Sequence, residues 1–486
     1  MNTKTVDDKA SVALRQQAFS KLKKNIDTIA EKYFVDFNID RRSYREISHI
    51  HGKEVSYWKL LMGAFSYMGN KNILLCGNPG SGKTTYTSLL SCMFSGLQFD
   101  LFDALKIQCH PDQTKDTMLA RADLGRLAEE GVVWQASVYL PAISLDEINR
   151  LSPGKQAIIM EYIRTGMVEH LSKAFFRGKI PVFATMNENG AGTYPLPPPS
   201  LDRFDISLPF DLPVAAWEDN IQEASERLEL ELTDRNTTSE VITALLNKDK
   251  TLDLKLQYLA AKSTEGAIRL KKLGIEILTP AETNAMLSLP PMAVDAIHFY
   301  RSMIEEFNTS LVSGTLPDIE TPNDKDKAFA SGKVKKGLSH RALSAIKFYS
   351  GMLAGYLGSK NIGIEHILAV APYCISHKVQ FFMDYEGKFA TSRLFGERKE
   401  IDLSRHVLGE TKANYDNVAN DLRLLTLYVE DDEGKISPQN KEAVKKVISR
   451  PTPEHSYLRH LYVESRKKMG LPQIASAVNT PTSKAP

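Results

Sequence analysis

Short apolar runs alternate with longer amphipathic stretches between Ile50 and Phe210. This alternation is typical of a parallel sheet whose strands are joined by crossover helices. Three of the runs predict strands, at Asn72–Cys76, Ser137–Leu145 and Ile180–Thr185. A helical pattern over residues 85–94 follows the first of them. This part of the chain therefore predicts an α/β domain with a parallel sheet and flanking helices.

Helical periodicity dominates the chain on both sides of this region. Residues 1–45 are polar with apolar positions at helical spacing, which predicts one or two helices. Beyond Pro213 the strand signals fade, and the last hundred residues are helix-like and highly charged. The remaining pattern predicts helices at Trp217–Leu232, Ala281–Leu289 and Ala293–Phe307, and helical periodicity again over Leu338–Gln380.

Two segments have the composition of loops or disorder. A linker rich in Pro, Gly, Asp and Lys runs from Ser313 to Gly337 and ends in a basic cluster at Lys333, Lys335 and Lys336. We interpret it as a solvated loop, with contact to an anion as the alternative. The tail from Ala475 is small and polar, as disordered segments are.

Composition excludes several classes of protein. The 486 residues carry 61 Lys and Arg against 59 Asp and Glu, so no overall basic field indicates nucleic acid or a membrane surface. The N-terminus has no apolar segment of a signal peptide, and the longest apolar stretch, Ile367–Ile375, is too short to span a bilayer. The four cysteines show no metal or redox spacing, which favours buried reduced thiols and a cytoplasmic protein.

A glycine-rich turn joins the first predicted strand to its helix. Gly77–Thr84 reads Gly-Asn-Pro-Gly-Ser-Gly-Lys-Thr and matches the P-loop pattern G-x-x-x-x-G-K-[ST]. Such a loop points backbone N–H groups and a helix N-terminus at phosphates. Lys83 would reach the β- and γ-phosphates and Thr84 would bind Mg²⁺. The predicted nucleotide site comprises Gly77, Asn78, Pro79, Gly80, Ser81, Gly82, Lys83, Thr84 and Thr85.

The two later strands also end in polar residues. The second leads into Asp146 and Glu147, which suit an ATPase in which Asp146 holds Mg²⁺ through water and Glu147 polarises the attacking water. The third leads into Asn187, which could orient that water. Alone, these would be two surface acids and a turn-forming asparagine. Their order after a P-loop favours a catalytic site.

These motifs resemble those of the MoxR family of AAA+ ATPases over roughly residues 46–380. Asp146-Glu147-Ile148-Asn149-Arg150 matches the family's D-E-I-N-R motif, and Gly192–Pro197 with Leu201–Phe204 matches its G-T-Y-P-L-P and L-D-R-F run. Three further segments are similar to the helix leading into the family's core, to the segment after its second strand and to a G-x-S-x-R-A motif of its lid: Ile50–Glu54, Lys106–Asp112 and Gly337–Ala342.

The resemblance implies roles that the residues alone do not assign. It implies ATP with Mg²⁺, and a homo-hexameric ring. Arg203 would be an arginine finger that reaches the γ-phosphate held by a neighbouring subunit, and Arg341 would be a sensor that closes the lid on its own subunit's nucleotide. Charge develops on the phosphoryl oxygens during hydrolysis, so arginines there raise the rate.

The expected fold class is an AAA+ P-loop NTPase core followed by an α-helical lid and a mainly helical C-terminal extension. The expected domains are an N-terminal helical extension (1–45), the α/β nucleotide-binding domain (46–211), the lid with an insertion (212–385), the helical C-terminal extension (386–474) and a disordered tail (475–486).

A segment between the second and third strands offers a candidate substrate contact. By similarity, Arg164–Lys179 is a hairpin that faces the central pore of the ring. Its basic side chains surround Phe175 and Phe176, and basic residues with aromatics could grip nucleic acid or an extended peptide. The alternative is that both phenylalanines pack the hairpin while the charges face water.

Three functions follow. The first is a MoxR-type ATPase that remodels or assembles a protein partner, chaperone-like, with a von Willebrand factor A domain protein or a metal-centre client as the implied partner. The second is a nucleic-acid-stimulated motor related to McrB, because AAA+ motors of the McrB and midasin type also have Met at the place of Met186. The third is a nucleotide-switched scaffold, against which Glu147 argues. The near-zero net charge and the lack of a recognised DNA-binding module favour the first.

Overall fold

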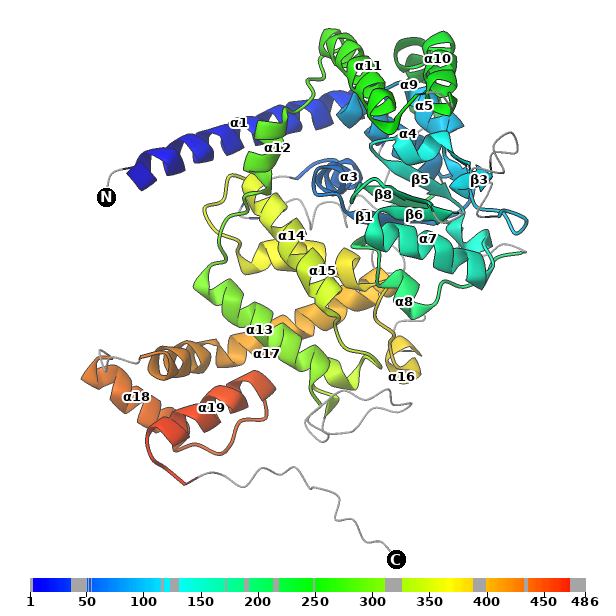
Figure 1. Cartoon of the computed structure of the whole chain (residues 1–486). Helices are drawn as coiled ribbons and strands as arrows, with labels where there is room; N and C mark the ends of the chain where they lie inside the picture. Colours follow the sequence, from blue (N-terminus) through cyan, green and yellow to red (C-terminus); the bar gives the residue numbers. More distant parts are fainter. Residues whose placement is uncertain are drawn as a thin grey trace, which may run out of the picture. The chain divides into compact units, whose positions relative to one another are not determined.

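The computed structural model describes residues 3–35, 50, 52–53, 55–114, 118–122, 131–170, 173–187, 192–212, 218–247, 250–310, 326–387, 399–431 and 436–472 (Figure 1). The chain divides into two compact units. Residues 1–289 and 351–359 form the first, and residues 290–350 and 360–486 form the second. The five-segment division expected from the sequence stays a prediction.

The first unit is built on a five-stranded sheet with the order β2-β5-β8-β1-β9. The strands are β1 (Asn72–Gly77), β2 (Ile107–Gln108), β5 (Ile143–Asp146), β8 (Val182–Met186) and β9 (Ile206–Phe210). All four pairings are parallel. Residues 73–76 of β1 are fully buried, as expected for a strand covered on both faces. The predicted parallel sheet is confirmed.

Helices flank this sheet in the first unit (Figure 1). Both α3 (Trp58–Met68) and α4 (Lys83–Ser95) contact its strands. The other helices of the unit are α1 (Thr3–Lys32), α5 (Phe99–Ala104), α7 (Pro153–Thr165), α8 (Pro198–Leu201), α9 (Glu218–Leu232), α10 (Arg235–Leu246), α11 (Leu252–Lys272) and α12 (Pro280–Leu287). Thr279 and Glu282 form a capping box that fixes the start of α12.

Two local predictions in this unit are wrong. The run Ser137–Leu145 is not one strand, because residues 136–139 form a 3₁₀ helix and β5 begins only at Ile143, after Pro141. Ile50–Glu54 was expected to be helical, yet Ile50 and Lys53 form an isolated antiparallel bridge and the helix starts at Trp58. The first error arose because a short apolar run does not distinguish strand from other buried backbone. The second arose because Ile50–Glu54 was assigned by resemblance alone.

Two antiparallel hairpins extend the α/β core. One pairs β3 (Ala120–Ala122) with β4 (Val132–Trp134), and the other pairs β6 (Met167–His170) with β7 (Lys173–Phe176). The second is the hairpin expected within Arg164–Lys179. Phe175 is 4% exposed and Phe176 is 68% exposed, because neighbouring strand residues face opposite sides. Only one of the two phenylalanines packs.

The second unit is helical. It contains α13 (Val294–Asn308), α15 (Ile364–Ile375), α16 (Met383–Gly387), α17 (Lys399–Val429), α18 (Pro438–Ile448) and α19 (Ser456–Lys468). The long α17 packs against α13, α15, α18 and α19. Helix α14 (His340–Tyr356) begins in the second unit, and residues 351–356 are counted with the first. The mainly helical C-terminal region is confirmed.

The end of the predicted linker is not a solvated loop. Residues 330–332 form a 3₁₀ helix, and Lys333 is buried and forms an ion pair of 2.8 Å with Glu410. The first part of the linker, residues 313–325, and the tail from Ala475 lie outside the described residues. All four cysteines are free and buried, as predicted. No helix in the described ranges is both long and apolar enough to cross a bilayer.

Candidate active site

The P-loop residues form a turn between β1 and α4. Gly80 and Gly82 have φ of +80°, in the left-handed region that glycine adopts freely. The loop delivers the chain to the N-terminus of α4, whose first residues are Lys83 and Thr84. The Lys83 ammonium donates to the carbonyl oxygens of Gly77 and Asn78 at 2.9 and 2.6 Å. Lys83, which is predicted to contact phosphate, is thus held against the loop that would surround the phosphate.

Gly77 ends β1 where no side chain fits. Its φ is +156°, and a Cβ at this position would lie 1.8 Å from the carbonyl oxygen of Phe210 in β9. We expect Gly77→Ala to push β9 away from β1 and lower the free energy of unfolding by about 3 kcal/mol. Chemical denaturation measures this. Gly154→Ala is the control, because nothing lies within 4 Å of its Cβ. Equal stability of the two variants would contradict the expectation.

The structure brings the predicted metal ligands together. Asp146 at the end of β5 accepts hydrogen bonds from the hydroxyls of Thr84, at 3.0 Å, and Thr185, at 2.7 Å. Hydroxyl and carboxylate oxygens are the hard donors that Mg²⁺ takes from proteins, usually with few protein ligands. The residues therefore fit the ion that the sequence predicts.

Glu147 is fixed by groups on three sides. Its backbone N–H donates to Thr185 Oγ1 at 2.8 Å, its Oε1 accepts from the Asn187 amide, and its Oε2 pairs with Arg150 Nε at 2.7 Å. Its own φ and ψ are 55° and 51°, a left-handed conformation that non-glycine residues seldom adopt. The two predicted catalytic residues, Glu147 and Asn187, are thus in direct contact.

Three supporting residues were missed by the sequence reasoning. Thr185 is fully buried and joins Asp146 to Glu147. Asn149 donates from Nδ2 to the carbonyl oxygen of Asn187 at 2.8 Å, and Arg150 pairs with Glu147. Thr185 could have been found because a polar residue inside an apolar strand needs a buried partner. Asn149 and Arg150 could have been found because they belong to the D-E-I-N-R motif.

The acidic pair also acts on a buried thiol. Cys109 follows β2, and its backbone N–H donates to the Asp146 carbonyl oxygen at 2.9 Å. Burial raises the pKa of the Cys109 thiol above its usual range, and the charges of Asp146 and Glu147 raise it further. The thiol therefore stays neutral beside the site and is no candidate nucleophile.

Arg203 lies between α8 and β9. Its backbone N–H donates to the Ser200 carbonyl oxygen at 3.1 Å, and its own carbonyl oxygen accepts from Asn72 Nδ2 at 2.9 Å. The pKa of Glu161 on α7 is lowered chiefly by a hydrogen bond from Arg164 and to a smaller extent by the charge of Arg203. The arginine is thus anchored by its backbone at the start of β9, facing α7.

Arg341 belongs to the second unit. It lies in the first turn of α14 and its side chain is exposed. The site described above is made of residues of the first unit. The expected contact of Arg341 with the nucleotide stays a prediction.

A cavity of about 160 Å³ borders the P-loop. It lies between P-loop residues, the chain just beyond α1, and α9, and is lined by Tyr33, Phe34, Val35, Lys59, Gly80, Ser81, Gly82, Thr85, Phe210, Asp211, Ile221, Ala224, Ser225 and Leu228. Phe34 packs on Tyr86 of α4, with ring centroids 5.6 Å apart. The Tyr33 hydroxyl donates to Glu231, and burial followed by this bond raises its pKa. Tyr33 and Phe34 of the N-terminal segment thus form an aromatic wall of this cavity, although no base-binding residue could be identified from the sequence.

Comparison with known proteins agrees with this geometry. Residues 72–206 match the model of the ATPase family associated with various cellular activities (AAA). The matched segment contains the P-loop, Asp146, Glu147, Asn187 and Arg203, and Arg341 lies outside it. No curated protein sequence matches the chain.

The fold is similar to that of a solved structure. The crystal structure of a candidate ATPase from Cytophaga hutchinsonii aligns with a TM-score of 0.52, over 84% of this chain and 98% of that chain, at 14% identity. At that identity the likeness shows the fold alone. Together the family match and the fold show an AAA+ core with helical extensions, and the chain is an ATPase.

Proposed function

We propose that this chain is a Mg²⁺-dependent ATPase of the MoxR type that works as a ring and remodels a protein partner. The observation that carries the catalytic part is the contact between Glu147 and Asn187 beside the Asp146–Thr84 pair, at the carboxyl ends of β5 and β8. A carboxylate held by an amide beside a metal site can accept a proton from water. The ring and the protein partner rest on the sequence resemblance.

In the proposed reaction Glu147 takes the proton of the attacking water. Oε1 accepts a hydrogen bond from Asn187, Oε2 forms an ion pair with Arg150, and each oxygen keeps a lone pair for water. Asn187 would orient the water through its amide, and Lys83 would exchange its backbone carbonyl partners for phosphate oxygens. Mg²⁺, when bound by Thr84 and Asp146, supplies positive charge to the phosphates. Arg203 of a neighbouring subunit and Arg341 would stabilise the charge of the transition state.

The cavity beside the P-loop is our proposed place for the base. We expect Ala224→Phe, which projects a ring from α9 into this cavity, to weaken ATP binding about tenfold or more. Titration with a fluorescent ATP analogue measures the effect. Ala261→Phe on the exposed side of α11 is the matched control and should bind normally. Unchanged affinity in Ala224→Phe would place the base elsewhere.

The remodelling function is tested by the dependence of ATPase rate on protein concentration, with and without single-stranded and duplex DNA. We expect the rate per chain to rise with concentration as rings assemble, and to be indifferent to DNA. A pull-down with Glu147→Gln, which should hold ATP without turnover, would recover the partner. A rate per chain independent of concentration would contradict the ring. Strong stimulation by DNA that falls with salt would support the second candidate, a motor related to McrB.

A further inference from the structure

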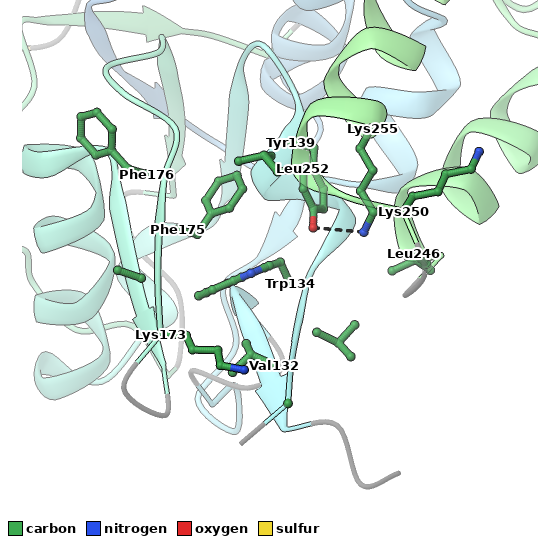
Figure 2. A pocket seen from close by; sticks show the side chains of 13 residues that line it. Val132, Trp134, Tyr139, Lys173, Phe175, Phe176, Leu246, Lys250, Leu252 and Lys255 are labelled. Atoms are coloured by element: carbon green, nitrogen blue, oxygen red, sulfur yellow. Dashed lines mark hydrogen bonds between the residues drawn. The ribbon is translucent and has the colours of Figure 1, made fainter. Parts of the chain in front are cut away.

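A second cavity, of about 400 Å³, lies in the first unit between its two hairpins and α10–α11 (Figure 2). It shares no lining residue with the cavity beside the P-loop. Its walls are Gly131, Val132, Val133, Trp134, Tyr139, Lys173, Ala174, Phe175, Phe176, Leu246, Lys250, Leu252 and Lys255. This volume lies in the range of pockets that bind small molecules. The nucleotide site described above does not account for it.

The cavity has a buried positive charge. Lys255 of α11 is 6% exposed, and its ammonium donates to the Tyr139 hydroxyl at 3.2 Å and lies 4.7 Å from the centre of that ring. Burial lowers the pKa of Lys255, and the nearby charge of Lys250 lowers it further. Lys173 approaches from β7 on the opposite side (Figure 2). Among the described lining residues there are three lysines and no carboxylate.

Aromatic rings form the floor between these two lysines. Phe175 packs against Trp134 and Tyr139, with centroid distances of 5.5 and 5.4 Å. Figure 2 shows Trp134 lying across the cavity between Lys173 and the Lys255–Tyr139 pair. Trp134 is only partly buried, so part of its surface faces the cavity. An aromatic surface beside cations is how proteins bind the base and the phosphate of one nucleotide.

The cationic side chains favour phosphate over carboxylate. Lysine binds phosphate as a point charge, whereas planar carboxylates are more often matched by the fork of arginine, and no arginine lines the described cavity. A buried ammonium without a carboxylate is costly, and an anion that enters the cavity offsets that cost. The ligand that suits the cavity is therefore an anion with a flat apolar part.

We propose that this cavity binds a phosphate-bearing ligand of nucleotide size, with its base against Trp134, its phosphate at Lys255, and Lys173 on the opposite side, where the next phosphate of a strand would lie. The ligand is either a free nucleotide or one nucleotide of a single strand. The site is independent of the ATPase site, so it goes beyond the proposed function.

The test is binding of fluorescein-labelled dT12 by anisotropy to the full chain carrying Lys83→Ala, which disables the P-loop site without adding a nucleotide that could enter the second cavity. Lys255→Met keeps the length of the side chain and removes its charge. We expect it to weaken binding about tenfold. Lys262→Met, on the same helix and paired with Glu265 at 3.0 Å, should bind within about twofold of the unchanged chain. If Lys255→Met fails to fold, Lys173→Gln takes its place. It changes an exposed side chain, so the fold should be kept, and it should also weaken binding.

Competition identifies the source of the phosphate. Displacement of dT12 by dTMP supports a free nucleotide, and displacement by unlabelled dT12 alone supports a strand. The proposal would be overturned if Lys255→Met and Lys173→Gln bound dT12 as tightly as the unchanged chain. It would also be overturned if neither labelled dT12 nor labelled dTMP bound. Displacement by a twelve-residue polyglutamate at lower concentration than dT12 would overturn it in favour of an acidic peptide. None of these results depends on ATP hydrolysis, so the proposed function can fail separately.

Discussion

Replacing Glu147 by glutamine is expected to lower ATP turnover by about 10²–10⁴-fold while leaving nucleotide binding intact. The glutamine amide keeps the size of the side chain and can still meet Asn187, which donates to Oε1. It is not basic enough to take a proton from water. It also loses the ion pair of 2.7 Å between Oε2 and Arg150, because the amide has one oxygen and its NH2 group would face Arg150 Nε once that oxygen accepts from Asn187.

The measurement is steady-state phosphate release together with the affinity for a fluorescent ATP analogue. Glu240→Gln is the matched control, since Glu240 is an exposed glutamate of α10 in the same unit and should be active. Turnover within about threefold of the unchanged chain would mean that another group is the base. A parallel loss of ATP affinity would assign Glu147 to binding rather than to chemistry.

Arg203→Ala is expected to lower turnover by about 10³-fold or more, again with normal nucleotide affinity. The reason is that a guanidinium at the γ-phosphate stabilises charge that is present only in the transition state. The backbone of residue 203 holds its hydrogen bonds to Ser200 and Asn72 whatever its side chain, so the start of β9 should keep its place. Arg164→Ala is the control, because Arg164 is a half-exposed arginine that pairs with Glu161.

Mixing experiments decide whether Arg203 acts across a subunit boundary. Chains with Arg203→Ala keep an intact P-loop, and chains with Lys83→Ala keep an intact Arg203. In a mixed ring, the arginine of one would complete the site of the other, and activity should return in part. An absence of rescue at every mixing ratio would place Arg203 at its own subunit's site or outside catalysis.

Much of the candidate site could be predicted because its residues are adjacent in motifs. The P-loop, Asp146-Glu147 and Asn187 each follow a strand, and parallel strands with β8 beside both β1 and β5 bring their carboxyl ends together. Alternating apolar runs were enough to predict the parallel sheet and three of its strands, although β2 and β9 were not predicted and the extent of β5 was wrong. The contact of Asn187 with Glu147 follows from the same arrangement.

Other features depend on packing between distant segments, which no local pattern encodes. The cavity beside the P-loop joins residues 33–35 to α9, nearly two hundred positions later. Thr185 reads as one more strand residue until its bonds to Asp146 and Glu147 are seen. The burial of Lys333 depends on Glu410 of α17. A charged side chain buried by a distant partner has the same sequence signature as a solvated one.

One error had a signal in the sequence. Pro141 interrupts the apolar run Ser137–Leu145, and β5 begins two residues after it. Proline lacks the N–H that a central strand must donate, so it marks a boundary. The β6–β7 hairpin also had a signal in the sequence. Successive strand residues face opposite sides, so one of Phe175 and Phe176 could have been expected to be buried and the other exposed.

The left-handed backbone of Glu147 lowers the stability of the fold at a residue that the proposed reaction requires. Glycine or asparagine adopts φ near +55° at lower cost, whereas a glutamate there costs the folded chain about 1–3 kcal/mol. Selection for stability alone would therefore remove the glutamate, and the chain keeps it in the one place where its carboxylate meets Asn187 and Arg150. A stabilised version of this chain, chosen by melting temperature without an activity screen, would be expected to lose the proposed base at this position.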